Sequence, residues 1–312
     1  MTRWVTYSSG PGAPLRAGVL HEGRVHGRAG TETLLDLVGT DLTAEGRDVL
    51  AALAEVLDEA AVVLHAPIPV PPSIRDFMAF ENHAVTSLEA VGSSLAPAWY
   101  DAPAFYFTNP RAVVGTGTPV AVPPGSAAFD YELEVAVVIG REGSDIPVEQ
   151  AWSHVAGVTI LCDWSARDLQ AHEMAVGLGP AKGKDSATTL GPWLVTPDEL
   201  EPYRRGHGFD RAMRASVNGV GYSAGTLADL YWSFEEMIAY ASRGTRLVPG
   251  DVLGSGTVGT GCILELSRVH GGDRYPWLVP GDEVELSVEG LGSIQHVVRA
   301  GASVPPLRQR PA

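Results

Sequence analysis

The stretch Asp130-Tyr-Glu-Leu-Glu-Val-Ala-Val-Val-Ile139 places two glutamates directly before a long apolar run. In an extended strand successive side chains point to opposite faces, so Glu132 and Glu134 share one face. Two carboxylates this close repel each other, and in a partly buried site protonation or a cation must relieve the repulsion. On a solvent-facing strand edge the same pair would cost little. The stretch therefore predicts a strand, over about residues 132–140, whose glutamates lie either at a cation site or on a polar edge.

Further strands are predicted by short apolar segments that turn-forming residues bound on either side. This pattern occurs at residues 4–7, 17–20, 113–123, 155–163, 193–196, 215–218, 252–256, 263–269 and 283–288. Predicted helices are fewer and do not alternate regularly with these strands. We therefore expect an α+β fold that is predominantly β, in preference to a doubly wound parallel sheet.

Three segments have the sequence features of helices. Residues 165–174 directly follow a predicted strand, with Ser165 as the expected N-cap. A capping box at residues 233–236 begins a helix that should run to about residue 242, with a glycine just beyond. Residues 45–59 carry leucines at helical spacing, namely Leu50, Leu53 and Leu57.

One proline-rich segment marks the predicted domain boundary. In Ala66-Pro-Ile-Pro-Val-Pro-Pro-Ser73 the alternate prolines favour an extended, semi-rigid connector. We therefore expect a small N-terminal α+β domain over residues 1–65, a proline-rich linker over residues 66–74 and a larger catalytic domain over residues 75–312.

The composition limits the partners and the compartment. The 312 residues carry a net charge of −15, which disfavours nucleic acid or an anionic membrane as a partner. A small anionic substrate is not excluded, because arginine, lysine and a metal can reverse the field inside one pocket. Residues 1–10 lack the apolar run of a signal peptide, and no later run is long enough for a membrane helix. The two cysteines, Cys162 and Cys262, are expected to be buried, inert thiols of a cytoplasmic protein.

A third carboxylate, Asp163, ends an apolar strand and precedes a predicted helix. On that helix Arg167 and Gln170 are three residues apart and therefore share a face. In isolation, a surface ion pair would be the simpler explanation for Arg167. Three carboxylates offer only oxygen ligands, which suit a hard cation such as Mg²⁺, Mn²⁺ or Ca²⁺. The sequence shows no Cys/His cluster that would suggest zinc.

Together these motifs resemble the fumarylacetoacetate hydrolase family over roughly residues 70 to 290. The resemblance rests on several spaced motifs in the right order: Asp130-Tyr-Glu-Leu-Glu-Val135, Cys162-Asp-Trp-Ser-Ala-Arg-Asp-Leu-Gln170, Lys182-Gly-Lys-Asp185, Leu190-Gly-Pro-Trp193, Pro249-Gly-Asp-Val252, Ser255-Gly-Thr257 and Leu264-Glu-Leu266. It implies the family's mixed β-sandwich roll, with a small variable N-terminal domain and a homodimer.

The resemblance also implies roles for individual residues. The metal ligands fall on Glu132, Glu134 and Asp163, with Asp76 as a further acidic ligand. His83 matches the general base and Glu265 the glutamate that orients it. Glu265 also has support of its own, because it interrupts an apolar segment predicted to be a strand, where a buried carboxylate needs a partner.

Other positions match residues that contact the substrate. Those that hold it or stabilise the departing carbanion are Arg167, Gln170 and Lys184, with Lys182 as an alternative for the lysine; Tyr106 and Thr257 match substrate contacts and Thr188 lies behind them. Met78 and Met174 stand where the enzyme that gives the family its name has tyrosines, and the stretch between Thr257 and Glu265 is shorter. Both departures leave the identity of the substrate open.

The function that the resemblance implies is a Mg²⁺-dependent hydrolase, with Mn²⁺ or Ca²⁺ as alternative metals. It would cleave a carbon–carbon bond in a small 1,3-dicarbonyl acid, with water activated by His83 and Glu265. The same scaffold also supports decarboxylation, hydration and isomerisation or tautomerisation of 2-oxo acids, so a lyase or isomerase is the alternative. A catalytically silent binding protein is a third hypothesis, against which the presence of both His83 and Glu265 argues.

Overall fold

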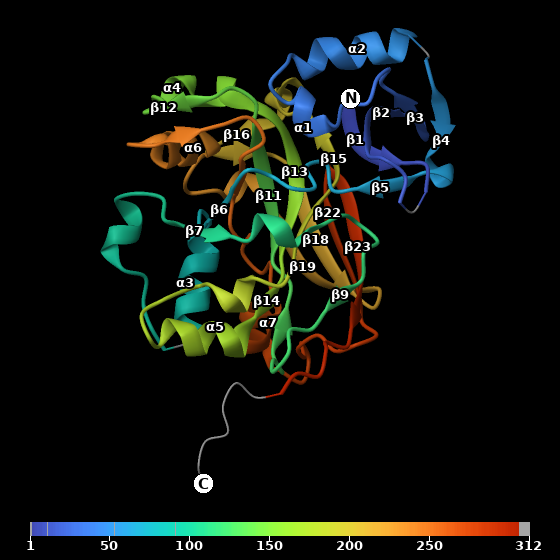
Figure 1. The fold of residues 1–312 in the computed structure, drawn as a ribbon. Helices are drawn as coiled ribbons and strands as arrows, with labels where there is room; N and C mark the ends of the chain where they lie inside the picture. Colours follow the sequence, from blue (N-terminus) through green and yellow to red (C-terminus); the bar gives the residue numbers. More distant parts are fainter. Residues whose placement is uncertain (1, 11, 53, 91, 306–312) are drawn as a thin grey trace.

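The computed structural model describes residues 2–10, 12–52, 54–90 and 92–305, and a large mixed sheet forms its centre (Figure 1). Twelve of the described strands belong to this sheet. Its main path is β4 (Val56–Asp58), β3 (Arg24–Gly27), β2 (Arg16–His21), β1 (Arg3–Ser8), β15 (Thr188–Val195), β13 (Val155–Asp163), β11 (Leu133–Ile139), β21 (Val252–Gly254), β6 (Ile74–Phe77) and β7 (Phe105–Thr108). In addition, β5 (Val63–His65) pairs with β1, and β8 (Val113–Val114) pairs with β15.

A second sheet packs against one face of the first. Its order is β19 (Val220–Thr226), β18 (Ala212–Val217), β22 (Glu283–Val288), β23 (Gly292–Arg299) and β9 (Val120–Ala121). Alternate residues of β11, such as Val135 and Val137, form one core cluster with Leu286 and Ile294 of this second sheet. Two sheets packed on a common apolar core confirm the predicted α+β, predominantly β fold.

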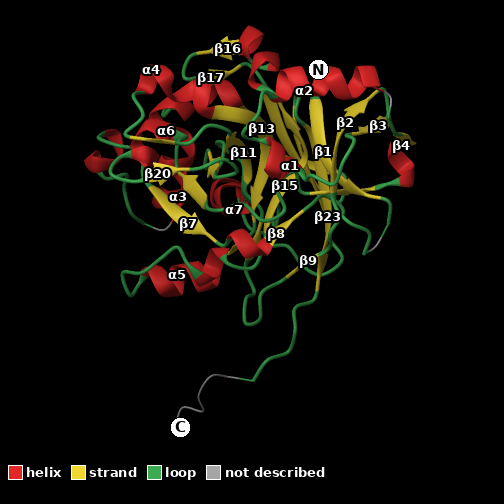
Figure 2. Cartoon of the chain, turned by 45° about the horizontal axis from the view of Figure 1, so that its top comes forward, coloured by secondary structure: helices red, strands yellow, loops and turns green. Residues whose placement is uncertain are grey.

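The other face of the large sheet is covered by helices of the N-terminal unit. The intervening residues of β11, Ala136 and Val138, pack in a second core cluster with α1 (Leu34–Leu37) and α2 (Leu42–Ala52). Figure 2 shows these helices beside the N-terminal strands. Because β1 pairs directly with β15, the N-terminal unit and the rest of the chain share one sheet. The residue limits of the predicted domains remain a prediction.

Helices α3, α5 and α7 gather at the opposite end of the molecule from α2 (Figure 1). The remaining helices and strand pairs are α3 (Glu81–Ala90), α4 (Val148–Ala151), α5 (Arg167–Met174), α6 (Phe234–Ser242) and α7 (Ile263–His270), with β10 (Phe129–Asp130) on β14 (Ser165–Ala166), β12 (Gly143–Ser144) on β20 (Arg246–Leu247), and β16 (Arg204–Arg205) on β17 (Gly208–Phe209). Among the described residues, no helix has both the length and the apolar character needed to cross a membrane.

Most predicted strands are present, but the strand predicted at residues 263–269 is wrong. This segment forms the helix α7, and its buried positions Ile263 and Leu266 are three residues apart, as on one face of a helix. Both carboxylate oxygens of Asp130 accept hydrogen bonds from backbone N–H groups of its first turn, at 2.8 and 3.0 Å. A short apolar run fits either element by periodicity, and here a distant aspartate stabilises the helix.

Three other predictions need correction. The helix predicted over residues 45–59 ends at Ala52 and strand β4 follows it, while Leu53 lies outside the described residues. The strand predicted over residues 113–123 is divided into β8 and β9, with Gly117 between them at φ +79°. Ser165 is not an N-cap, because it lies in β14 and Ala166 precedes α5. The capping box of α6 is present as predicted.

Candidate active site

Three carboxylates from three strands meet at one end of the large sheet. They are Asp76 on β6, Glu134 on β11 and Asp163 on β13. Two residues along each strand from them lie Ile74, Ala136 and Leu161, which pack in the core cluster beneath the N-terminal helices. Because side chains alternate along a strand, the three carboxylates lie on the same face of the large sheet as these apolar residues. They lie beyond the part of that face that the N-terminal helices cover.

The three carboxylates have the arrangement of a cation site. Each offers an oxygen, and these oxygens all lie within 4.8 Å of one another. Among the described residues, three buried oxygens of the site have no hydrogen-bond partner: Asp76 Oδ1, Asp163 Oδ1 and the hydroxyl of Thr188. Thr188 on β15 pairs with Asp163 on β13. Buried polar atoms are nearly always paired, so these oxygens have the geometry and the chemistry to bind a hard divalent cation.

Two glycines keep this end of β21 close to the carboxylates. A Cβ on Gly254 would lie 2.5 Å from Asp76 Oδ1 and 3.2 Å from Glu134 Oε2. Gly256 has a φ of +76°, and a Cβ there would lie 2.3 Å from the carbonyl oxygen of Phe77. The backbone N–H of Gly256 donates to Glu134 Oε2 at 3.0 Å, and the hydroxyl of Thr257 lies 3.3 Å from Oε1. A side chain at position 254 would therefore meet the carboxylates, and one at position 256 would meet the backbone of β6 and the residue after it.

Glu132 lies beside this cluster and is bound by two cations of the chain. Arg167 Nη2 donates to Glu132 Oε1 at 2.7 Å, and Lys184 Nζ contacts Glu132 Oε2. Lys184 also donates to Asp163 Oδ2 at 2.7 Å. Burial alone would raise the pKa of Glu132, but Arg167 and Lys184 outweigh it and lower that pKa below its usual range. Glu132 therefore links the carboxylate cluster to the cationic side of the site.

Negative charge exceeds positive charge around the three carboxylates. Burial raises the pKa of Asp163 to about 7, with Lys184 opposing this and Glu132 and Asp76 adding to it. Burial, followed by the charge of Asp76, raises the pKa of Glu134 well above its usual range. Both burial and this repulsion disfavour the charged carboxylates, and protons or a bound cation relieve both. The raised pKa values and the unpaired oxygens thus both indicate a site for a cation.

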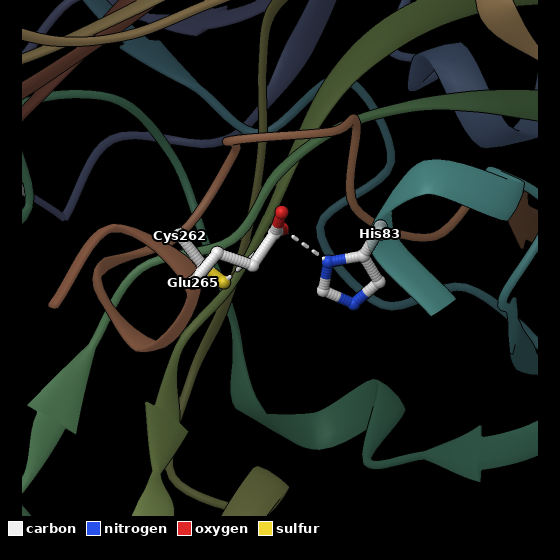
Figure 3. Close-up of side chains that lie close together, drawn as sticks. All are labelled: His83, Cys262 and Glu265. Atoms are coloured by element: carbon white, nitrogen blue, oxygen red, sulfur yellow. Dashed lines mark hydrogen bonds and ion pairs between the residues drawn. The ribbon is translucent and has the colours of Figure 1, made fainter. Parts of the chain in front are cut away.

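A histidine–glutamate pair lies on the other side of the site (Figure 3). His83 projects from α3, and its Nδ1 lies 2.5 Å from Oε1 of Glu265, in the first turn of α7. The backbone N–H of Thr260 donates to Glu265 Oε2 at 2.9 Å and so fixes the carboxylate. A carboxylate only accepts hydrogen bonds, so we assign the ring proton to Nδ1. His83 Nε2 is then left with a free lone pair.

One cavity of about 540 Å³ joins these groups. The proposed site residues that line it are Asp76, Met78, His83, Tyr106, Glu132, Glu134, Arg167, Gln170, Met174, Lys184 and Thr257. Asp163, Thr188 and Glu265 are buried behind this wall. Of the two lysines, Lys184 is buried in the site, whereas Lys182 is exposed and pairs with Asp185. The phenol of Tyr106 contacts Asp163 and lies 3.2 Å from Asp76 Oδ2.

Asp130 and Cys262 belong to the site but were given no function from the sequence. Asp130 accepts from Arg167 Nε at 2.8 Å while it caps α7, so it connects Arg167 with the helix that carries Glu265. The Sγ of Cys262 lies 3.6 Å from Glu265 Oε1. Asp130 stands in the informative stretch at residues 130–139, but its partner Ile263 is 133 residues away. No local pattern could indicate that contact.

A buried carboxylate cluster and a histidine–glutamate pair on one cavity define the active site of an enzyme that can hold a metal. The family model of the fumarylacetoacetate hydrolase C-terminal domain matches residues 73–299. Human fumarylacetoacetase is 30% identical over 288 residues, which cover 74% of this chain and 68% of that protein. The chain belongs to the fumarylacetoacetate hydrolase family, whose members include hydrolases and isomerases and typically depend on a metal.

Two solved structures resemble the whole chain. Fumarylacetoacetate hydrolase from Exiguobacterium antarcticum has 26% sequence identity and a TM-score of 0.75, and the match covers 96% of this chain and 100% of that one. A probable 2-hydroxyhepta-2,4-diene-1,7-dioate isomerase from Mycobacterium abscessus has 26% identity and a TM-score of 0.73, with 96% and 99% covered. The same fold therefore occurs in a hydrolase and in a probable isomerase.

Proposed function

We propose that the protein is a divalent-metal-dependent hydrolase that cleaves a carbon–carbon bond in a small 1,3-dicarbonyl acid, an acylpyruvate or a compound like fumarylacetoacetate. One observation carries the proposal: His83, which Glu265 holds, lines the same cavity as Asp76 and Glu134 of the carboxylate cluster. Asp76, Glu134 and Asp163, with Glu132 beside them, would hold the cation, for which we propose Mg²⁺. When bound, such a cation supplies a Lewis acid that polarises a substrate carbonyl.

His83 is the group that would activate water. Its Nδ1–H is held by Glu265, so Nε2 takes the proton from a water molecule whose oxygen attacks the acyl carbonyl carbon. The carbon–carbon bond then breaks, and its electron pair passes to the other fragment as an enolate. Protonation of that enolate carbon completes the reaction. An acylpyruvate then gives a carboxylic acid and a 2-oxo acid, whereas a compound like fumarylacetoacetate gives a carboxylic acid and a 3-oxo acid. Glu265 stabilises the imidazolium that exists between these steps.

The cationic residues suit an anionic substrate and an enolate. Arg167, Gln170 and Lys184 line the same cavity, and the Arg167 guanidinium lies 3.2 Å from Gln170 Oε1. Burial would lower the pKa of Lys184, but Asp163 and Glu132 outweigh it and raise that pKa, so the ammonium stays charged. A fixed positive charge next to the oxygen of the developing enolate lowers the activation barrier, because no surrounding group has to reorient during the reaction.

The remainder of the cavity indicates the tail of the substrate. Its wall includes apolar side chains such as Met78, Leu88, Phe105, Met174 and Leu264. A thioether offers no hydroxyl to bind a polar group on the tail. We therefore propose a substrate whose tail is less polar than the fumaryl group.

The second candidate function is isomerisation or decarboxylation of a 2-oxo acid. The similarity to the probable isomerase from Mycobacterium abscessus favours it, because a site that stabilises an enolate serves both reactions. In such an enzyme no water is activated, and His83 would only move a proton on the substrate. A binding protein without activity would not need the buried pair of His83 and Glu265.

A product screen tests the proposal. Purified protein with Mg²⁺ is incubated with acylpyruvates of graded tail polarity, fumarylpyruvate, fumarylacetoacetate and oxaloacetate, and products are identified by mass spectrometry. We expect carbon–carbon hydrolysis, fastest with an apolar tail, that excess chelator abolishes. His83→Ala should lose it, while His172→Ala, at an exposed histidine on α5, should keep it. Carbon dioxide or an isomer as the only product would support the second candidate instead.

A further inference from the structure

The histidine–glutamate pair has a third neighbour that the proposed reaction does not use. Cys262 immediately precedes α7, and its Sγ lies 3.6 Å from Oε1 of Glu265. One ligand atom from each of His83, Cys262 and Glu265 lies within 4.8 Å of the other two. Figure 3 shows the three side chains converging from α3 and from the start of α7. They supply one nitrogen, one sulfur and one oxygen.

This set of atoms matches the ligands of zinc. Zinc binds histidine nitrogen and carboxylate oxygen at about 2.0–2.2 Å and cysteine sulfur at about 2.3 Å, commonly with three protein ligands and one open position. A tetrahedral ion with those bond lengths separates its sulfur and oxygen ligands by about 3.5 Å. The separation of Cys262 and Glu265 is already 3.6 Å. The 2.5 Å contact between His83 and Glu265 must open to admit the ion.

We propose that His83, Cys262 and Glu265 form a second metal site, selective for a thiophilic divalent cation such as Zn²⁺, and that its occupation switches the enzyme off. The carboxylate cluster is a different site, because Asp76, Glu134 and Asp163 offer only oxygen and suit a harder ion. The approach to the second site is from the cavity, since His83 forms part of its wall.

Inhibition follows from the tautomer of His83. A neutral imidazole carries one N–H, and Nδ1–H donates to Glu265 in the structure. A cation on Nδ1 forces the ring proton onto Nε2, which faces the reaction as a donor and can no longer accept a proton from water. The cation also replaces the thiol proton of Cys262, so binding releases one proton in total. The catalytic base is thereby removed while the fold stays unchanged.

The protonation of the Cys262 thiol explains why the inhibited state forms only when the cation is bound. A thiol is mostly protonated at neutral pH, and Cys262 lies buried beside the carboxylate of Glu265. Without a metal the thiol stays protonated and the histidine–glutamate pair is intact. Metal binding deprotonates a cysteine ligand outright, so the site is formed only when a thiophilic ion is present.

Cadmium is a direct probe of the site, because a Cd²⁺–thiolate bond absorbs in the ultraviolet. The intact protein, saturated with Mg²⁺, is titrated with Cd²⁺ while absorbance and residual hydrolysis are followed. Changes to groups around a metal ligand already cost about 10–100-fold in affinity, so Cys262→Ala should raise the midpoint of inhibition at least about tenfold and remove the absorbance. Cys162→Ala, at the other free buried cysteine, is the matched control and should keep both signals. Cys262→Ser serves if the alanine variant does not fold.

The absorbance readout does not depend on activity, so it separates this proposal from the proposed function. Thiolate absorbance that persists in Cys262→Ala, or disappears only in Cys162→Ala, would overturn the assignment. So would inhibition that excess Mg²⁺ reverses equally in wild type and Cys262→Ala, because Cd²⁺ would then act at the carboxylate cluster. Absorbance that depends on Cys262 in a protein without hydrolase activity would support the metal site and reject the proposed reaction alone.

Discussion

Gly254 is a residue whose lack of a side chain leaves room for the carboxylate cluster. It carries no ligand, yet any side chain there would lie between Asp76 and Glu134, 2.5 Å from one oxygen and 3.2 Å from another. The strand β21 thus contributes to the site by the absence of a Cβ. Within the part of the chain that the structure describes, no other strand glycine has two carboxylates of the cluster as neighbours.

We predict that Gly254→Ala weakens cation binding by about 10–100-fold, because the methyl group displaces both carboxylates. Isothermal titration with Mn²⁺ or Mg²⁺ measures this directly. The matched control is Gly221→Ala on β19, where an added Cβ meets no atom within 4 Å. Unchanged affinity in Gly254→Ala would show that the cation binds elsewhere.

At the scale of single elements, α7 sets the position of Glu265 beside His83. Its first turn carries Glu265, its N-terminus is capped by Asp130, and Asp130 also binds Arg167. The N-terminus of α7 and the guanidinium of Arg167 therefore share one buried carboxylate, that of Asp130. Burying the charged Asp130 carboxylate without Arg167 as its partner would strongly destabilise the folded state.

We predict that Asp130→Asn destabilises the protein by about 3 kcal/mol, the lower end of the range for a broken buried ion pair, since Glu132 still contacts Arg167. Urea unfolding monitored by fluorescence gives the free energy. Asp41→Asn is the control, because Asp41 also accepts from the first turn of a helix, α2, but at an exposed position where asparagine caps as well. It should change stability by less than about 0.5 kcal/mol. A similarly small effect for Asp130→Asn would mean that the buried pair does not stabilise α7.

Elements differ in how far local sequence determines them. Strands β11, β13 and β22 were predictable from the sequence. Their apolar or alternating runs have the length and the pattern of a strand and lack the spacing of an amphipathic helix. The helix α7 was not, because eight residues fit both periods and its cap is distant in sequence. Strands β6 and β7, helix α3 and strand β23 were also missed. Of these, β6 and α3 carry Asp76 and His83, so much of the site rests on elements whose conformation depends on tertiary pairing.

The whole molecule depends on the contact between its two sheets, and His296 lies at that contact. It is buried on β23, its Nδ1 lies 2.7 Å from the carbonyl oxygen of Thr118, and its Nε2 lies 3.1 Å from the hydroxyl of Thr189 on β15. That hydroxyl accepts from Trp164 Nε1 at 2.9 Å. We assign the neutral imidazole with its proton on Nδ1, so that Nδ1 donates to Thr118 and Nε2 accepts from the Thr189 hydroxyl.

Burial lowers the pKa of His296 below its unfolded value of 6.5, with the bond to Thr118 opposing this in part. A depressed folded-state pKa means that the unfolded chain binds more protons at acidic pH. The contribution to stability is therefore fully present above pH 6.5 and is lost as the pH falls through the folded-state value. We predict that the stability difference between wild type and His296→Gln shrinks as the pH falls from 7.5 to 5, in urea unfolding. A pH-independent difference, as expected for the exposed control His172→Gln, would contradict this.

The site could be predicted from the sequence only in part, for a reason that belongs to the whole molecule. Alternation on one strand placed Glu132 and Glu134 on one face, the end of another predicted strand added Asp163, and the family resemblance added Asp76 and His83. The parallel pairing of β21 with β6 sets Gly254 beside Asp76, although 178 residues separate them. Cys262 and His83 likewise lie close together only because α7 packs against α3. The sequence showed no zinc-like spacing because that cluster is formed by the tertiary structure.

In the proposed reaction His83 activates a water molecule that cleaves a carbon–carbon bond. The most direct test is hydrolysis of the best acylpyruvate in ¹⁸O-water, with mass spectrometry of the acid product at early times. A sample without enzyme corrects for exchange of the substrate carbonyl. We predict one ¹⁸O atom in the new carboxylate, and a loss of about 10²–10⁴-fold in rate for His83→Ala. An unlabelled product that is released with carbon dioxide or as an isomer, at a rate that His83→Ala leaves unchanged, would contradict the account.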